Sequence, residues 1–440
     1  MKYLFVACLL CLSVLSAVAK VPAMNKIRLT NNWEYLKGDL GGIWEAVRPA
    51  APGSSEAVPI WQPVTLPHCF NAEDAVDPDV NYYEGPGWYK TLLAIDNPYR
   101  NGRIVLDFDG AGQKTDVYVY TTHVGSHVGG YDSWNVDITD AVKAFLGSKD
   151  AERFKGKVPL SIRCDNSRDL EMIPSDLADF NIYGGLYRYL NLVYLPEVSF
   201  EQIRLESSLS SNLKEGILKV KTSFYNPEDI RKADVTVSVY DVDRKPVFSK
   251  TLEGILPLGD QLLAEMKIKN PVLWDVDVPQ LYTCELTVKT PDQTFTTEER
   301  FGFRHTEFKD KGPFFLNGKR LLLRGTHRHE DHAGVAQAMT EDMMRREMRM
   351  MKDMGVNFIR LGHYQQSEII LDLCDELGIL VWEEIPWCRG GLGGDVYKKQ
   401  ARRMLANMIV QHHNHPAVII WGLGNENDWP NDFPEFEQRE

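Results

Sequence analysis

The sequence predicts a multidomain protein in which two β-sandwiches precede a domain of alternating strands and helices. From about residue 25 to residue 195, short stretches of alternating apolar and polar residues are separated by turns rich in Gly, Asn and Asp, as is typical of a β-sandwich. A second all-β stretch, near residues 199–304, has the length of an immunoglobulin-like sandwich. After Phe301, apolar strands alternate with helices, which indicates a parallel sheet covered on both faces.

Both sandwiches are predicted from side chains that alternate with a period of two. In a strand, this alternation places the apolar side chains on one face, where they can form a core. The clearest stretches in the first sandwich are residues 103–108 and 116–120, and those in the second are residues 216–222, 233–240 and 282–288.

The third domain is predicted from four apolar strands with helices between them. Thr340 and Ser367 are suitable N-caps for two helices that end at Gly355 and Gly378, and a third helix is expected over residues 397–412. The methionines of the first helix recur at helical spacing, so we expect them in the core and not around a cofactor. The four expected strands cover residues 321–325, 356–360, 379–382 and 417–421.

The composition is that of a folded protein with an excess of acidic residues. Lys and Arg total 49 and Asp and Glu total 62, which gives a formal net charge of −13. An acidic surface repels phosphate backbones, and the sequence contains no Lys/Arg cluster, so a nucleic-acid partner is not expected. The composition leaves the oligomeric state open.

The first 19 residues have the pattern of a secretory signal peptide. Lys2 precedes an apolar run over residues 3–15, and small residues follow up to Ala19, which predicts cleavage after Ala19 and export to the periplasm or the extracellular space. The run is shorter than the ~20 apolar residues of a membrane-spanning helix, so no membrane span is expected after its removal. The remaining cysteines are scattered and predict neither a disulfide framework nor a zinc knuckle; they are Cys69, Cys164, Cys284, Cys374 and Cys388.

Polar and aromatic side chains follow each of the four predicted parallel strands. Because the carboxyl ends of parallel strands meet at one edge of a sheet, these side chains are expected to form one site. The site would be rich in carboxylates, imidazoles and indoles, as is usual in proteins that grip and cleave sugars. The four clusters cover residues 327–332, 360–364, 383–387 and 424–427.

Glu426 is the candidate acid within this group. It follows a buried strand and has Asn425 and Trp421 nearby in the sequence. Burial beside aromatic rings raises the pKa of a carboxyl group, which suits a general acid. We therefore expect Glu426 to be catalytic.

The histidines of the first cluster are a weaker signal for a metal. His329 and His332, with Glu330 and His327, include ligand types that bind metals. However, the spacing is not the i, i+4 of a zinc helix, and the segment follows a strand. The loop at residues 390–394 is rich in glycine, but no Lys-Ser/Thr pair follows it to bind phosphate.

These motifs together resemble glycoside hydrolase family 2, the family of β-galactosidases, β-glucuronidases and β-mannosidases. The similarity covers nearly all of the sequence after residue 19 and is most specific in the third domain. The motifs in the first two domains are residues 66–68, 85–89, 129–131, 183–188 and 274–282. Those in the third domain are residues 317–319, 324–330, 357–360, 363–364, 374–378, 414–416 and 424–426.

The resemblance implies a fold and a domain organisation. Residues 1–19 would be the signal peptide, and residues 20–198 a galactose-binding-like β-sandwich of the jelly-roll type. Residues 199–304 would be the immunoglobulin-like sandwich. Residues 305–440 would be the N-terminal half of a (β/α)8 TIM barrel, with about four βα units, because they are too few for a barrel of ~250 residues.

The resemblance also implies roles for individual residues. Glu426 would be the acid/base, and Asn425 would contact the sugar 2-hydroxyl. Arg360, His329 and His363 would line the subsite of the cleaved sugar, which Asp179 would reach from the first domain. Glu384, Trp387 and Trp421 lie at the same strand ends and are further candidates for substrate binding, although Glu383 and Glu384 are better interpreted as salt-bridge partners that orient their neighbours.

The sequence departs from the family pattern at two places. In metal-dependent β-galactosidases a Glu and a His after strand three bind magnesium, but Cys388 and Gly390 occupy those positions here, so no metal and no cofactor are expected. The family nucleophile is a Glu at the end of barrel strand seven, and the sequence ends soon after strand four. A retaining mechanism requires two carboxyl groups ~5–5.5 Å apart, and only the acid/base is recognisable.

The expected function is hydrolysis of terminal β-glycosidic bonds in an oligo- or polysaccharide by a retaining mechanism. Asp179, His329 and His363 favour a β-galactosidase, with a β-glucuronidase or β-mannosidase as alternatives. A second hypothesis is that this chain is a truncated, non-catalytic carbohydrate-binding protein, since half a barrel would bind sugar without turnover.

Overall fold

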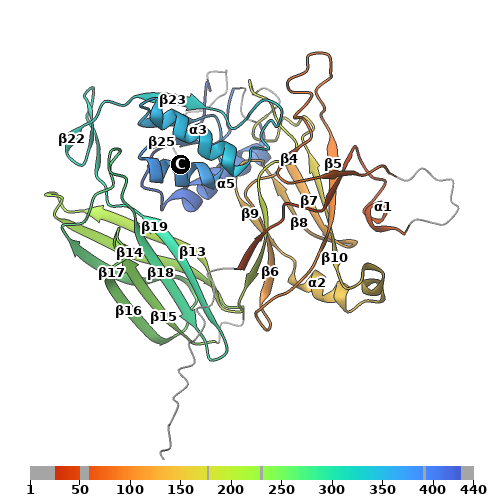
Figure 1. Cartoon of the computed structure of the whole chain (residues 1–440), viewed down its shortest axis with the longest axis horizontal. Coiled ribbons are helices and arrows are strands. Elements are labelled where there is room, and N and C mark those ends of the chain that lie inside the picture. Colours follow the sequence, from red (N-terminus) through yellow and green to blue (C-terminus); the bar gives the residue numbers. More distant parts are fainter. Residues whose placement is uncertain (1–24, 50–58, 176–177, 228–230, 390–392, 428–440) are drawn as a thin grey trace, which may run out of the picture.

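The computed structural model describes residues 25–49, 59–175, 178–227, 231–389 and 393–427. The expected signal peptide and part of the glycine-rich loop lie outside these residues. The described chain forms two β-sandwiches and an α/β domain that lies against both of them (Figure 1). Among the described residues, no helix is long and apolar enough to cross a membrane.

The N-terminal domain is a sandwich of two antiparallel sheets, as predicted. Its core contains fully buried side chains such as Tyr89, Leu106 and Ile162. One sheet has the order β3 (Gln62–Val64), β2 (Trp33–Lys37), β5 (Pro86–Leu93), β10 (Val158–Asp165), β7 (Lys114–Val119) and β8 (Thr122–Val128). The other has the order β1 (Asn25–Arg28), β12 (Leu190–Leu195), β6 (Arg103–Phe108) and β9 (Trp134–Asp137). Shorter elements are α1 (Trp44–Val47), α2 (Thr139–Leu146), a 3-10 helix (Lys149–Phe154) and the pair β4 (His68–Cys69) and β11 (Gly185–Leu186).

The middle domain is a smaller antiparallel sandwich in which buried and exposed side chains alternate. In β15 (Ala233–Tyr240) every second side chain is buried, as the sequence pattern predicts. Its sheet is completed by β16 (Pro246–Ile255), β18 (Tyr282–Lys289) and β19 (Thr294–Phe301). The facing sheet contains β13 (Ser199–Leu209), β14 (Glu215–Tyr225) and β17 (Gly259–Lys269).

The third domain contains four neighbouring parallel strands connected by helices, which is the predicted half-barrel arrangement. The parallel strands follow chain order: β23 (Gly325–Arg328), β24 (Phe358–Leu361), β25 (Leu380–Glu384) and β26 (Val418–Gly422). Helices α3 (Glu341–Asp353), α4 (Glu368–Leu377) and α5 (Asp395–His412) connect them. A small sheet of β20 (Thr306–Phe308), β21 (Phe314–Leu316) and β22 (Lys319–Arg320) precedes them.

The predicted helix signals are confirmed, but the first predicted strand is wrong. The Thr340 hydroxyl accepts from Met343 N, the Ser367 hydroxyl accepts from Ile369 N, and Gly378 ends α4 with φ 69°. The strand expected over residues 321–325 begins only at Gly325. Leu322 is 70% exposed, so an apolar run does not make a buried strand where it has no neighbouring strand to pair with, and pairing with β24 starts at Gly325.

Candidate active site

The carboxyl ends of β24 and β25 are joined by an ion pair between Arg360 and Glu384. Arg360 Nη2 lies 2.9 Å from Glu384 Oε1, and Arg360 Nε lies 3.2 Å from Oε2. This two-point geometry is the strongest form of an Arg–carboxylate contact. The Glu384 side chain is fully buried, so its position supports the interpretation that it orients its neighbours.

Glu384 and Arg360 connect two further predicted residues to the same site. His363 Nδ1 lies 2.8 Å from Glu384 Oε1, and Arg360 Nη2 donates to Asn425 Oδ1 at 2.8 Å. Asn425 follows β26, so the ends of three strands meet in one network. The structure thus brings together the side chains that the resemblance assigns to the cleaved-sugar subsite.

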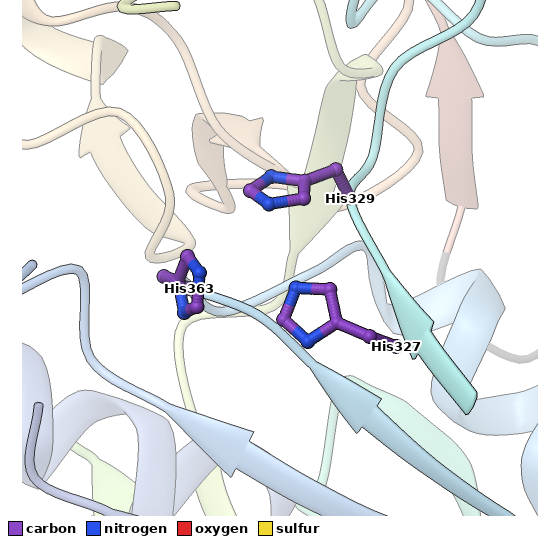
Figure 2. A group of neighbouring side chains, drawn as sticks. All are labelled: His327, His329 and His363. Carbon is purple, nitrogen blue, oxygen red and sulfur yellow. The ribbon is translucent and has the colours of Figure 1, made fainter. Parts of the chain in front are cut away.

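Three imidazoles lie beside this network (Figure 2). The ring centroids of His327, His329 and His363 are 4.8–5.2 Å apart. Burial, with the neighbouring His363 and His329, lowers the pKa of His327 to about 4. Burial and His363 also lower the pKa of His329. His327 and His329 are therefore uncharged at neutral pH and can donate and accept hydrogen bonds.

Asp179 reaches the strand ends from the N-terminal domain and contacts the loop after β25. The Cys388 thiol donates to Asp179 Oδ1 at 3.3 Å, and Asn425 Nδ2 lies 3.4 Å from Cys388 Sγ. Arg389 lies between two carboxylates, with Nη1 3.6 Å from Asp179 Oδ2 and Nε 3.1 Å from Glu426 Oε2. Asp179, Asn425 and Glu426 are therefore neighbours in space.

The expected burial of Glu426 beside aromatic rings is wrong for the described chain. Its side chain is 55% exposed and pairs with Arg389. Of the two indoles expected at the site, Trp387 is fully buried in a cluster with Ile385, and Trp421 is partly buried and packs against the same cluster. Both indoles thus contribute to a hydrophobic cluster, while the Glu426 carboxyl group stays largely accessible to solvent.

Phe180, which the sequence analysis did not single out, lies close to the histidines. The Phe180 ring is 5.7 Å from that of His329 and 5.3 Å from that of Tyr364. The Arg360 guanidinium lies 5.0 Å from the Trp382 ring centroid. Phe180 follows Asp179 in the sequence, which is the only local signal that could have identified it.

A buried ion pair joins the N-terminal domain to the strand ends. Arg188 Nε lies 2.9 Å from Glu330 Oε1, and the two side chains are 1% and 0% exposed. Arg188 also donates to the carbonyl oxygens of Tyr131 and Gln365, both at 2.7 Å. The Tyr131 ring stacks on Tyr364 of the α/β domain at 4.2 Å. These contacts fix the sandwich, and with it Asp179 and Phe180, against the site.

Within the described residues, three side-chain groups have the spacing to hold a metal ion. Two of them belong to the site and share His363, and the third lies beside α4. The groups are His327, His329 and His363; Asp179, His363 and Cys388; and Asp372, Asp375 and His415.

Models of the glycosyl hydrolases family 2 match almost the whole chain. The sugar-binding domain model matches residues 40–196, the family 2 model matches residues 198–304, and the TIM-barrel domain model matches residues 307–438. The three models follow the order of the three domains.

Several characterised proteins are similar to this chain along most of its length. The crystal structure of a β-glucuronidase from Parabacteroides merdae is 99% identical with a TM-score of 0.91, over 93% of this chain and 53% of that one. A β-glucuronidase of Bacteroides fragilis is 32% identical over 82% of this chain and 53% of its own. A β-galactosidase of Thermoanaerobacter pseudethanolicus is 28% identical over 89% of this chain and 50% of its own. The chain thus spans about half the length of these relatives.

Proposed function

Because this chain belongs to glycoside hydrolase family 2, we propose that it forms the sugar-binding half of a retaining β-glycosidase with Glu426 as general acid/base. The observation that carries the proposal is the network of Arg360, Glu384, His363 and Asn425, which lies directly beside Glu426. A side chain that must meet one hydroxyl of a sugar has to be held in place, and Arg360 holds Asn425 in this way.

In the proposed reaction, Glu426 first gives its proton to the leaving-group oxygen and later takes a proton from the attacking water. Its exposed carboxyl group can reach a substrate that lies over the strand ends, and Arg389 can stabilise the carboxylate after the first proton transfer. The second carboxyl group of the mechanism is proposed to come from the half of the relatives' length that this chain does not span.

The proposed substrate is a β-glucuronide. The sequence analysis favoured a galactoside, but the comparisons favour a glucuronide, because the 99% identical structure is that of a β-glucuronidase and the β-galactosidase is 28% identical. Asp179, His329 and His363 do not distinguish the two sugars by their chemistry, since each can bind a hydroxyl of either one. We also propose that the protein is exported, because residues 1–19 have the pattern of a signal peptide.

The substrate proposal is tested with paired nitrophenyl substrates. A protein that contains this chain and extends to the length of its relatives should hydrolyse 4-nitrophenyl β-D-glucuronide with a higher kcat/KM than the corresponding galactoside. The reverse preference would overturn the assignment.

The alternative function, binding without turnover, is supported by the four neighbouring parallel strands of the α/β domain, which make half of an eight-stranded barrel. The 440-residue chain alone would then bind glucuronic acid in a calorimeter and release no nitrophenol. Turnover by the chain alone would exclude this alternative.

A further inference from the structure

We propose that Cys388 is a positioning residue that holds Asp179 and Asn425 in one arrangement at the site. The inference rests on the proposed function, in which these two side chains bind the sugar. The Cys388 thiol donates to Asp179 Oδ1 at 3.3 Å, and Asn425 Nδ2 donates to the Cys388 sulfur at 3.4 Å. One side chain thus bridges a residue of the N-terminal domain and a residue that follows β26 of the α/β domain.

The backbone around Cys388 is fixed by pairing with the segment that follows β26. Cys388 and Asn425 form a parallel β-bridge. Asn425 N donates to Trp387 O at 2.8 Å, and Arg389 N donates to Asn425 O at 3.0 Å. The Trp387 side chain is fully buried, and Cys388 is 1% exposed. Main-chain contacts and burial therefore hold the sulfur in place, as is required of a residue that orients others.

The surroundings of Cys388 differ from those of the other cysteines after residue 19. A free buried cysteine commonly packs as a small apolar side chain. The other four belong to hydrophobic clusters of the described residues, whereas Cys388 belongs to none of these clusters; the four are Cys69, Cys164, Cys284 and Cys374. Cys388 instead lies between a carboxylate and an amide, which indicates a hydrogen-bonding role.

The contact with the sulfur also determines which way the Asn425 amide faces. A guanidinium group can only donate, so Arg360 Nη2, 2.8 Å away, faces Asn425 Oδ1. The amide nitrogen then faces the Cys388 sulfur, which accepts. Because an amide nitrogen carries two hydrogens, one of them stays available for a sugar hydroxyl. Arg360 and Cys388 therefore fix the Asn425 amide from both of its ends.

The thiol gives Asp179 a buried partner. The ion pair of Asp179 with Arg389 spans 3.6 Å, and the two side chains are 38% and 48% exposed, so solvent screening weakens this pair. The Cys388 thiol is shielded from solvent, and burial raises its pKa to about 11. At neutral pH the thiol therefore keeps the proton that it donates to the Asp179 carboxylate.

Two substitutions at Cys388 separate hydrogen bonding from packing. In the glycosidase that contains this chain, Cys388→Ala should lower kcat/KM for 4-nitrophenyl β-D-glucuronide by about 3–10-fold, the effect of one lost hydrogen bond. Cys388→Ser should retain most of the activity, because a hydroxyl group also donates and accepts. A packing role predicts the opposite order, since a buried hydroxyl group without partners costs more free energy than a methyl group.

Cys374 provides the matched control. It is fully buried among apolar side chains of the α/β domain. Cys374→Ala and Cys374→Ser should leave kcat/KM unchanged, and Cys374→Ser should lower the urea midpoint more than Cys374→Ala does. Circular dichroism checks that all of these variants are folded.

The infrared S–H stretching band tests the contact without turnover. Donation of a hydrogen bond lowers the frequency of this band, and difference spectra against Cys388→Ser and Cys374→Ser isolate the bands of the two thiols. The Cys388 band should move to higher frequency in Asp179→Ala, because the thiol loses its acceptor, while the Cys374 band should stay unchanged.

An unchanged Cys388 band in Asp179→Ala would overturn the proposal, and so would a Cys388→Ala variant at least as active as Cys388→Ser. If the original protein hydrolyses no glucuronide, the proposed function fails, whereas the infrared comparison still decides whether the thiol bridges the two domains.

Discussion

Replacing Arg188 with methionine tests whether the N-terminal sandwich is held on the strand ends by one buried ion pair. Arg188 and Glu330 are 1% and 0% exposed, and three nitrogens of Arg188 have partners at 2.7–2.9 Å. Methionine fills similar space but leaves the Glu330 carboxylate buried without its cation. Breaking a buried pair in this way costs about 3–5 kcal/mol.

The assay is urea unfolding followed by tryptophan fluorescence, with Arg300→Met as the matched control. Arg300 also links two domains, pairing with Asp372 and Glu376 of α4, but its side chain is 37% exposed. Solvent screening limits such pairs to about 0–1 kcal/mol. Arg188→Met should therefore lower the free energy of unfolding several times more than Arg300→Met does.

A second change separates the charge from the packing. Adding Glu330→Gln to Arg188→Met removes the unpaired buried charge, so the double variant should recover part of the lost stability. Equal costs for Arg188→Met and Arg300→Met would refute the reasoning, and so would a double variant less stable than Arg188→Met alone.

Two further predictions concern the packing around α4. Burial lowers the pKa of His415, but attraction to Asp375, 2.7 Å away, outweighs burial and raises this pKa to about 9. The charged pair should therefore contribute its full stabilisation of the fold below about pH 6.5 and lose it as the pH rises through 9. Urea midpoints at about pH 6 and about pH 9.5 should differ less in His415→Gln, and an unchanged difference would contradict this. At Gly378 (φ 69°) a Cβ would lie 2.4 Å from Val276 O, whereas at Gly355 (φ 89°) it would meet nothing within 4 Å. Gly378→Ala should therefore lower the thermal midpoint more than Gly355→Ala, and equal shifts would refute the steric argument.

Local signals in the sequence predicted much of the fold. Caps such as Ser367 and stop signals such as Gly378 act within a few residues, so they can be recognised without knowledge of the tertiary structure. The strand expected at residues 321–325 failed because an apolar run does not show which neighbour it pairs with. Pairing with β24 places the strand at Gly325–Arg328 instead.

The site was predictable where strand order decides proximity. Arg360 and Glu384 lie at the carboxyl ends of two neighbouring parallel strands and Asn425 follows the third, and they meet as expected. Burial was not predictable in the same way, because the direction of each side chain at a strand end depends on the loop that follows. Glu426 therefore proved exposed, whereas Trp387 proved buried.

Contacts between domains were beyond the sequence analysis. Phe180 reaches the histidines from the first domain, and Arg188 pairs with a residue 142 positions away. A pair at such a separation leaves no periodic pattern in a single sequence, since nothing local specifies which surfaces of two domains meet.

The central claim is that Glu426 is the general acid/base, and Glu426→Gln tests it most directly in the glycosidase that contains this chain. The variant should lose about 10²–10⁴-fold in kcat on an alkyl β-glucuronide, whose leaving group needs a proton. It should lose much less in the glycosylation step of 4-nitrophenyl β-D-glucuronide, whose leaving group departs without one. Unchanged hydrolysis of the alkyl glucuronide would contradict the assignment.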